Sequence, residues 1–97
     1  MKYAIILSPE AIEDLRRLKA PVRSQVKEGI EMHLRHEPLK ESKSRIKRLR
    51  GMQRPGYRLR IGEIRVFYDV SDVTVEVLAV VPKSKASEWL GRMGARP

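Results

Sequence analysis

The sequence predicts a small α+β domain in which an antiparallel-rich sheet packs against a helical hairpin. Two segments near the N-terminus carry apolar residues at helical spacing, whereas the final third of the chain alternates or is rich in β-branched residues. The joins between these segments contain proline, glycine or aspartate, which are turn-forming residues. A length of 97 residues suits one domain over 1–97, with the element order β-α-α-β-β-β-α.

The chain is expected to begin with a short strand, because Tyr3, Ile5 and Leu7 alternate with side chains of the opposite face. Ser8 then provides an N-cap, and Pro9 suits the first position of a helix. This first helix is predicted to end near 19–20, since the residue before a proline disfavours helical geometry.

A second helix is predicted to begin at Pro21 and to end at Pro38. Its apolar residues recur every four positions, and Gly29 lies beside them where a close backbone approach would fit. The turn between the two helices is short, so we expect an antiparallel helical hairpin. The apolar positions are Val22, Val26, Ile30 and Leu34.

The second half of the chain is predicted to form three strands after a partly ordered basic connection over 39–56. The strands are expected at 57–61, 64–70 and 73–81, with turns at Gly62-Glu63 and Ser71-Asp72. The last strand is rich in β-branched residues, which is typical of a strand buried on both faces. A short C-terminal helix over 84–91, anchored by Trp89 and Leu90, and a flexible tail over 91–97 complete the prediction.

Positive charge is concentrated in one part of the chain. The chain contains 21 Lys and Arg against 12 Asp and Glu, a net charge of +9. Residues 40–65 contain 10 of the basic and only 2 of the acidic side chains, which leaves +8 in this segment. This distribution predicts a localised anion-binding face, with nucleic acid as the leading partner.

Composition excludes several other classes of protein. The chain has no cysteine, which excludes disulfide scaffolds, zinc fingers and thiol nucleophiles. The apolar run at the N-terminus is too short for a signal sequence or a membrane span, so we expect a cytoplasmic protein with no membrane partner. His33, His36 and Glu37 lack a further ligand at a recognisable spacing, and we expect neither a metal nor another cofactor.

The hairpin over 57–70 predicts a cationic face on the sheet. With Gly62-Glu63 as its turn, Arg60 lies opposite Arg65 and Arg58 lies opposite Phe67. All four share the face opposite the apolar core, because side chains alternate across a sheet. Directly opposed arginines are destabilising unless an anion lies between them, so this face indicates a site for phosphate and base. The alternative is an ordinary solvated face.

Further basic residues are candidates for the same interface. Lys83 and Lys85 follow the last strand and are expected at the same end of the sheet, with a polar turn as the alternative. We interpret the basic connection as a segment that binds backbone phosphates. The alternative is a charged segment whose side chains contact only water. Its candidate RNA-binding residues are Lys43, Arg45, Lys47, Arg48, Arg50 and Arg54.

These segments resemble the RelE/ParE superfamily of type II toxin–antitoxin toxins, and within it the RelE-like branch. The resemblance covers roughly residues 3–90 and lies in LSPEAIEDLRRL, RIKRLRGM, YRLRIGEIRVFYDV and VEVLAVVPKSKASEWL. It implies an endoribonuclease that cleaves mRNA on the translating ribosome and so inhibits translation. It also implies a cognate antitoxin that is acidic and partly disordered when free.

The resemblance further implies catalytic roles for Arg58, Arg60 and Arg65, which would orient the scissile phosphate and stabilise charge as the 2′-hydroxyl attacks. Lys83 and Lys85 flank Ser84, where the family often has a basic residue, and they are further catalytic candidates. Some members of the family have a C-terminal tyrosine where this chain has Leu90, and no other general acid or base is clearly placed.

Two alternative functions stay open at this point. One is a ParE-like toxin that inhibits DNA gyrase, because a fold does not fix a function. The other is a non-catalytic module that binds RNA or DNA.

Overall fold

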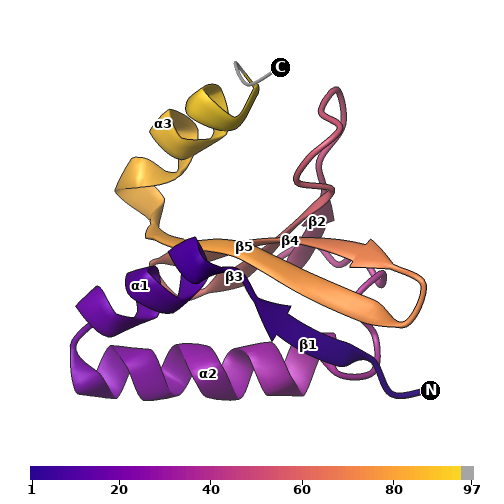
Figure 1. Cartoon of the computed structure of the whole chain (residues 1–97), viewed down its shortest axis with the longest axis horizontal. Helices are drawn as coiled ribbons and strands as arrows, with labels where there is room; N and C mark the ends of the chain where they lie inside the picture. The colour runs from indigo at the N-terminus through magenta and orange to yellow at the C-terminus, as the bar shows by residue number, and fades with distance from the viewer. Residues whose placement is uncertain (95–97) are drawn as a thin grey trace.

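The computed structural model describes residues 1–94, which form a five-stranded sheet with helices on both faces (Figure 1). The strand order is β1-β5-β4-β3-β2, with β1 parallel to β5 and the other neighbours antiparallel. This arrangement confirms the predicted α+β class. In chain order the elements are β1 (Ala4–Leu7), α1 (Pro9–Arg17), α2 (Ala20–Leu34), β2 (Ile46–Arg48), β3 (Tyr57–Ile61), β4 (Ile64–Ser71), β5 (Thr74–Pro82) and α3 (Lys83–Gly94).

Two apolar clusters lie on the two faces of the sheet. The core cluster packs the sheet against α1 and α2, and it contains Leu59, Val66 and Tyr68, which have no exposed surface. The outer cluster packs the opposite face against α3, and its buried residues are Phe67, Leu78, Ala79, Val81 and Trp89. Residues of β5 enter both clusters, which confirms the prediction of a strand buried on both faces.

Helix α2 approaches β3 closely at Gly29. A Cβ atom at this position would lie 2.6 Å from Cδ1 of Ile61, so the absence of a side chain lets the helix settle on the strand. The expectation of a close approach at Gly29 is therefore confirmed.

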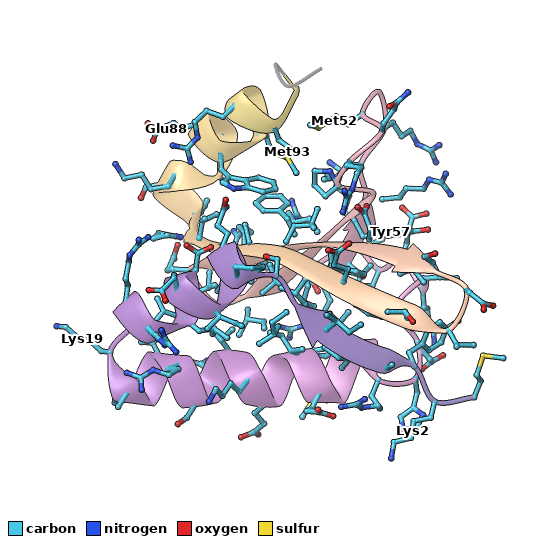
Figure 2. The ribbon with its side chains drawn as sticks, in the orientation of Figure 1. Lys2, Lys19, Met52, Tyr57, Glu88 and Met93 are labelled. Carbon is cyan, nitrogen blue, oxygen red and sulfur yellow. The ribbon has the colours of Figure 1, made fainter. Side chains whose placement is uncertain are left out.

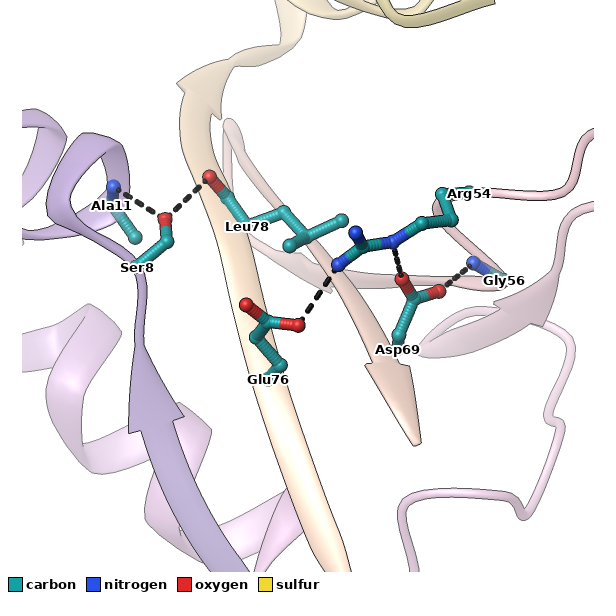
Figure 3. Close-up of polar contacts among 7 residues, drawn as sticks. All are labelled: Ser8, Ala11, Arg54, Gly56, Asp69, Glu76 and Leu78. Atoms are coloured by element: carbon teal, nitrogen blue, oxygen red, sulfur yellow. Dashed lines mark hydrogen bonds and ion pairs between the residues drawn. The ribbon is translucent and has the colours of Figure 1, made fainter. Parts of the chain in front are cut away.

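Helix α1 is joined to an irregularity in β5. The register between β4 and β5 shifts so that Phe67 pairs with Ala79 and Tyr68 pairs with Val77, which leaves Leu78 without a partner. The Ser8 hydroxyl donates to the Leu78 carbonyl at 3.0 Å (Figure 3). The carboxylate of Asp14 accepts from the Val80 amide at 2.9 Å. Ser8, the N-cap of α1, and Asp14 within α1 thus provide hydrogen-bond partners for two backbone groups of β5.

One additional strand and several helix boundaries differ from the sequence-based expectation. β2 lies inside the segment that we expected to be a connection; its three residues are too few for a recognisable alternation, and Ile46 is ordered by packing opposite Leu59. α3 continues to Gly94, so a flexible tail from residue 91 is wrong for 91–94, because Met93 packs against the outer cluster. The remainder of that predicted tail, 95–97, lies outside the described residues. Helix α1 ends at Arg17 and α2 begins at Ala20, close to the predicted bounds, but α2 ends at Leu34 and not at Pro38.

Within residues 1–94, none of the helices combines the length and the apolar character that a membrane span requires.

We predict that Ser8→Ala will lower the free energy of unfolding by about 1–2 kcal/mol. The hydroxyl both accepts from the Ala11 amide at 3.1 Å and donates to the Leu78 carbonyl, so the substitution removes the cap and the link to β5. Urea denaturation measures the change. Ser87→Ala, at an exposed position in α3, is the matched control and is expected to change the free energy by less than about 0.5 kcal/mol. Equal effects of the two substitutions would contradict this role for Ser8.

Candidate nucleic-acid interface

The β3–β4 hairpin has the register that the sequence predicts. Arg60 pairs with Arg65 and Arg58 pairs with Phe67 across a turn formed by Gly62 and Glu63. Gly62 has a φ of +56°, a conformation that glycine adopts readily at the first position of such a turn. The side chains of Arg58, Arg60 and Arg65 therefore share the outer face of the sheet, and we call this surface the arginine face.

The three guanidinium groups differ in exposure. Arg60 is exposed, Arg58 is half-buried, and Arg65 retains only 6% of its accessible surface. Nη1 of Arg65 donates to the carbonyls of Gly62 and Ile64, at 2.9 and 3.1 Å. Arg65 is thus fixed against its own turn. Among the described residues, no carboxylate forms an ion pair with any of the three, so their charge is uncompensated.

Arg58 is the least satisfied of these side chains. Its Nε atom is buried and has no hydrogen-bond partner within residues 1–94. Burial lowers the pKa of Arg58, and the nearby charges of Arg65 and Arg60 lower it further. A buried donor without an acceptor costs about 1–3 kcal/mol, and more for a charged group. A bound anion would offset the repulsion among the arginines.

Phe67 does not have the predicted role. Its side chain has no exposed surface and stacks on Trp89, with ring centroids 4.9 Å apart. The indole nitrogen of Trp89 donates to the Glu10 carboxylate at 2.6 Å, which ties α3 to α1. We expected an open face because the hairpin alone does not reveal that α3 covers it. Phe67 is therefore a packing residue in this conformation and not a surface on which a base can stack.

Lys83 and Lys85 diverge, although both are exposed in the first turn of α3. The amide of Lys83 donates to the Glu63 carbonyl at 2.7 Å, which places this residue beside the β3–β4 turn, as expected. Lys85 instead lines a groove of about 750 Å³ between α1 and α3, together with Glu10 and Asp14. Of the two lysines, the structure brings only Lys83 to the turn next to Arg65.

The basic residues of β2 and its surroundings lie in different places. Lys47 is exposed and pairs with Arg58 in the register, so it adds to the arginine face. The Arg48 guanidinium lies 5.9 Å from the centre of the Tyr57 ring. Arg45 donates to the Arg60 carbonyl at 3.1 Å and lines a hollow on the α2 side of the sheet. Lys43 and Arg50 are exposed.

Arg54 is engaged in ion pairs with two carboxylates. Its Nε lies 2.8 Å from Oδ2 of Asp69, and its Nη2 lies 2.8 Å from Oε1 of Glu76 (Figure 3). These contacts raise the pKa of Arg54, chiefly through the hydrogen bond to Asp69. The predicted phosphate contact of Arg54 gains no support from this arrangement, because two carboxylates already balance its charge. Sequence reasoning missed these partners, although strand alternation places Asp69 and Glu76 on the outer face.

The described part of the chain contains no group of three or more His, Asp or Glu side chains that would hold a metal ion. Burial lowers the pKa of His33, and the charge of Arg45 adds to this effect. The arrangement that remains is a set of uncompensated guanidinium groups suited to phosphate.

A scan of protein families matches residues 5–86 to the family described as ParE toxin of type II toxin-antitoxin system, parDE. No curated protein matches the chain by sequence.

Solved structures give close matches to the fold. The chain is similar to an arginine-to-alanine mutant of the E. coli toxin RelE in the free state, with 30% identity, a TM-score of 0.72, and coverage of 96% of this chain and 95% of that one. It is similar to the toxin–antitoxin complex RelBE2 from Mycobacterium tuberculosis, with 27% identity, a TM-score of 0.73, and coverage of 84% and 92%. The archaeal RelE–RelB complex from Pyrococcus horikoshii matches with 25% identity, a TM-score of 0.70, and coverage of 88% and 99%.

We predict that Phe67→Leu will leave the affinity for single-stranded RNA within about twofold of the original, because no surface of Phe67 is exposed to a ligand. The same substitution should lower the free energy of unfolding by about 1–2 kcal/mol through the lost ring stacking and volume. Fluorescence anisotropy and urea denaturation measure the two quantities. A large loss of RNA affinity with little change in stability would restore Phe67 as a base-stacking residue.

Proposed function

Because the chain belongs to the RelE/ParE superfamily of type II toxin–antitoxin toxins, we propose that it is an endoribonuclease that cleaves mRNA on the translating ribosome. The observation that carries the proposal is the convergence of Arg58, Arg60 and Arg65 on one face of the sheet, with no carboxylate partner within residues 1–94. An RNA phosphate fits this arrangement, since its oxygens accept several N–H donors at once. The likeness to the RelE toxin of E. coli supports the same function.

In the proposed reaction, the 2′-hydroxyl oxygen attacks the adjacent phosphorus, and the bond from phosphorus to the 5′-oxygen breaks. Negative charge grows on the phosphate as this happens. Arg58 and Arg60 would stabilise that charge directly, and Arg65 would hold the turn that positions them. Preorganised charge of this kind is often the largest contribution to an enzyme's rate.

Proton transfer is the part of the reaction for which the chain offers least. The hydroxyl of Tyr68 is buried and donates to the Pro38 carbonyl at 2.6 Å, and burial raises its pKa. It therefore serves the core and not the reaction, as the strand alternation predicts. Leu90, where the resemblance implies a tyrosine in some members, is half-buried beside the outer cluster. We propose that water or groups of the ribosome accept the 2′-hydroxyl proton and protonate the leaving oxygen.

The proposal includes a cognate antitoxin. Two of the similar structures are complexes of toxins with antitoxins, one from M. tuberculosis and one from P. horikoshii. A partner for this chain would have to neutralise the uncompensated charge of the arginine face. An acidic segment that is partly disordered when free has the required chemistry.

Induced expression in a bacterium, followed by mapping of transcript 5′ ends, tests this function. We predict cuts inside translated codons, with the cleavage rate reduced about 100-fold by Arg60→Gln, since loss of one charge-stabilising donor typically costs 10²–10³. The matched control is Arg16→Gln, an exposed arginine of α1 that pairs with Glu13. This variant should cleave at the original rate. Intact transcripts under induction of the unaltered chain would contradict the proposal.

A second candidate is inhibition of DNA gyrase, which the match to a ParE family favours. Growth arrest with induced DNA-damage signalling and intact mRNA would support this candidate. A third outcome, unaffected growth together with salt-sensitive RNA binding, would indicate a non-catalytic binding module.

A further inference from the structure

The segment 49–56, which joins β2 to β3, rises from the sheet on the same side as α3 (Figure 1). We call it the basic loop, because Arg50 and Arg54 lie in it and Lys47 and Arg48 directly precede it. Its base is closed by a hydrogen bond of 2.8 Å from the Leu49 amide to the Gly56 carbonyl. The Leu49 side chain packs against the outer cluster.

One side of the basic loop is tied to the sheet by carboxylates. Asp69 of β4 accepts from the Gly56 amide through Oδ1 at 2.5 Å and from Nε of Arg54 through Oδ2 at 2.8 Å (Figure 3). Glu76 of β5 accepts from Nη2 of Arg54 at 2.8 Å. One guanidinium therefore joins the loop to two neighbouring strands.

The other side of the loop approaches α3. Met52 is half-buried, and a Cβ atom built on Gly94 would lie 3.8 Å from its Cε atom. Met52 and Met93 face each other across the space between the loop and the helix (Figure 2). The basic loop thus lies next to α3 on one side, and the ion pairs of Arg54 hold it on the other side.

The cations of this region fall into two classes. Within residues 1–94, Lys47, Arg48 and Arg50 form no ion pair, whereas Arg54 is balanced by two carboxylates. The pair with Glu76 is largely exposed, because Arg54 retains 55% of its side-chain surface and Glu76 retains 45%, whereas Asp69 retains 21%. Pairs this exposed add little to global stability, because water and salt screen them. Their main effect is on the orientation of the loop.

We propose that Arg54 is a positioning residue, which holds the basic loop so that Arg50 meets the phosphates of an RNA strand bound on the arginine face. This inference rests on the proposed function, because it assumes that the face binds RNA. Arg54 itself contributes orientation and no phosphate contact.

Binding of a single-stranded RNA oligonucleotide, measured by anisotropy over a range of KCl concentrations, separates the two roles. Arg50→Met should make the slope of log K against log salt less steep by about 0.7, the value for one lost phosphate contact on a single strand. Arg54→Met should weaken binding about fivefold at every salt concentration with the slope unchanged, because a smaller fraction of molecules holds the loop correctly. A slope change of about 0.7 for Arg54→Met, or no loss of affinity, would overturn the proposal.

Amide hydrogen exchange without RNA tests the positioning step independently. Arg54→Met and Asp69→Asn should each speed exchange of the Leu49 and Gly56 amides at least tenfold, while the amides of β4 and β5 keep their protection. Arg50→Met is the control and should leave the loop protected. Unchanged exchange in Arg54→Met would refute the role of Arg54. If the unaltered chain binds no RNA, the proposed function fails, and the exchange rates still decide whether Arg54 holds the loop.

Discussion

The pairing of β3 with β4 determines which side chains of these strands enter the core and which form the arginine face. Leu59 and Val66 pair on the inner face, and Arg60 and Arg65 pair on the outer one. A slip of one residue would turn the guanidinium groups toward α1 and α2 and the apolar side chains toward the outer face. Core packing therefore forces the arginines together. The free energy gained by burying apolar side chains on the inner face offsets the repulsion among the arginines on the outer face.

The outer face of the sheet is divided along its length. Near the β3–β4 turn it carries arginines without carboxylate partners in the described residues, and in the middle it is closed by the stacked rings of Phe67 and Trp89. Toward the other end of β4 and β5, Asp69 and Glu76 hold Arg54. Arginines that count equally in the sequence therefore differ in the structure: within residues 1–94 those of the arginine face have no carboxylate partner, whereas Arg54 has two.

The sequence predicts the part of the site that depends on local rules. Gly62 favours a tight turn, and a tight turn together with strand alternation places Arg58, Arg60 and Arg65 on one face. Contacts between distant segments follow no such rule. Arg54 meets Asp69 and Glu76, and Phe67 meets Trp89, only after the whole sheet and α3 have assembled. β2 was missed for the same reason, since its order comes from packing against β3 and not from its three residues.

The irregularity at Leu78 changes the alternation of β5, so that odd-numbered residues face the core before it and an even-numbered residue faces the core after it. Before it, Val75 and Val77 face the core and Glu76 faces outward; after it, Val80 faces the core while Ala79 and Val81 face outward. A strand that changes phase needs apolar residues at consecutive positions, which explains the uninterrupted run over 77–81. The extra residue, Leu78, contributes its side chain to the outer cluster and its carbonyl to the Ser8 hydroxyl. Deleting it would leave Ala79 and Val81 facing outward, but α3 would lose the Leu78 side chain and Ser8 would lose the carbonyl to which it donates, so this one residue couples the helices on the two faces of the sheet.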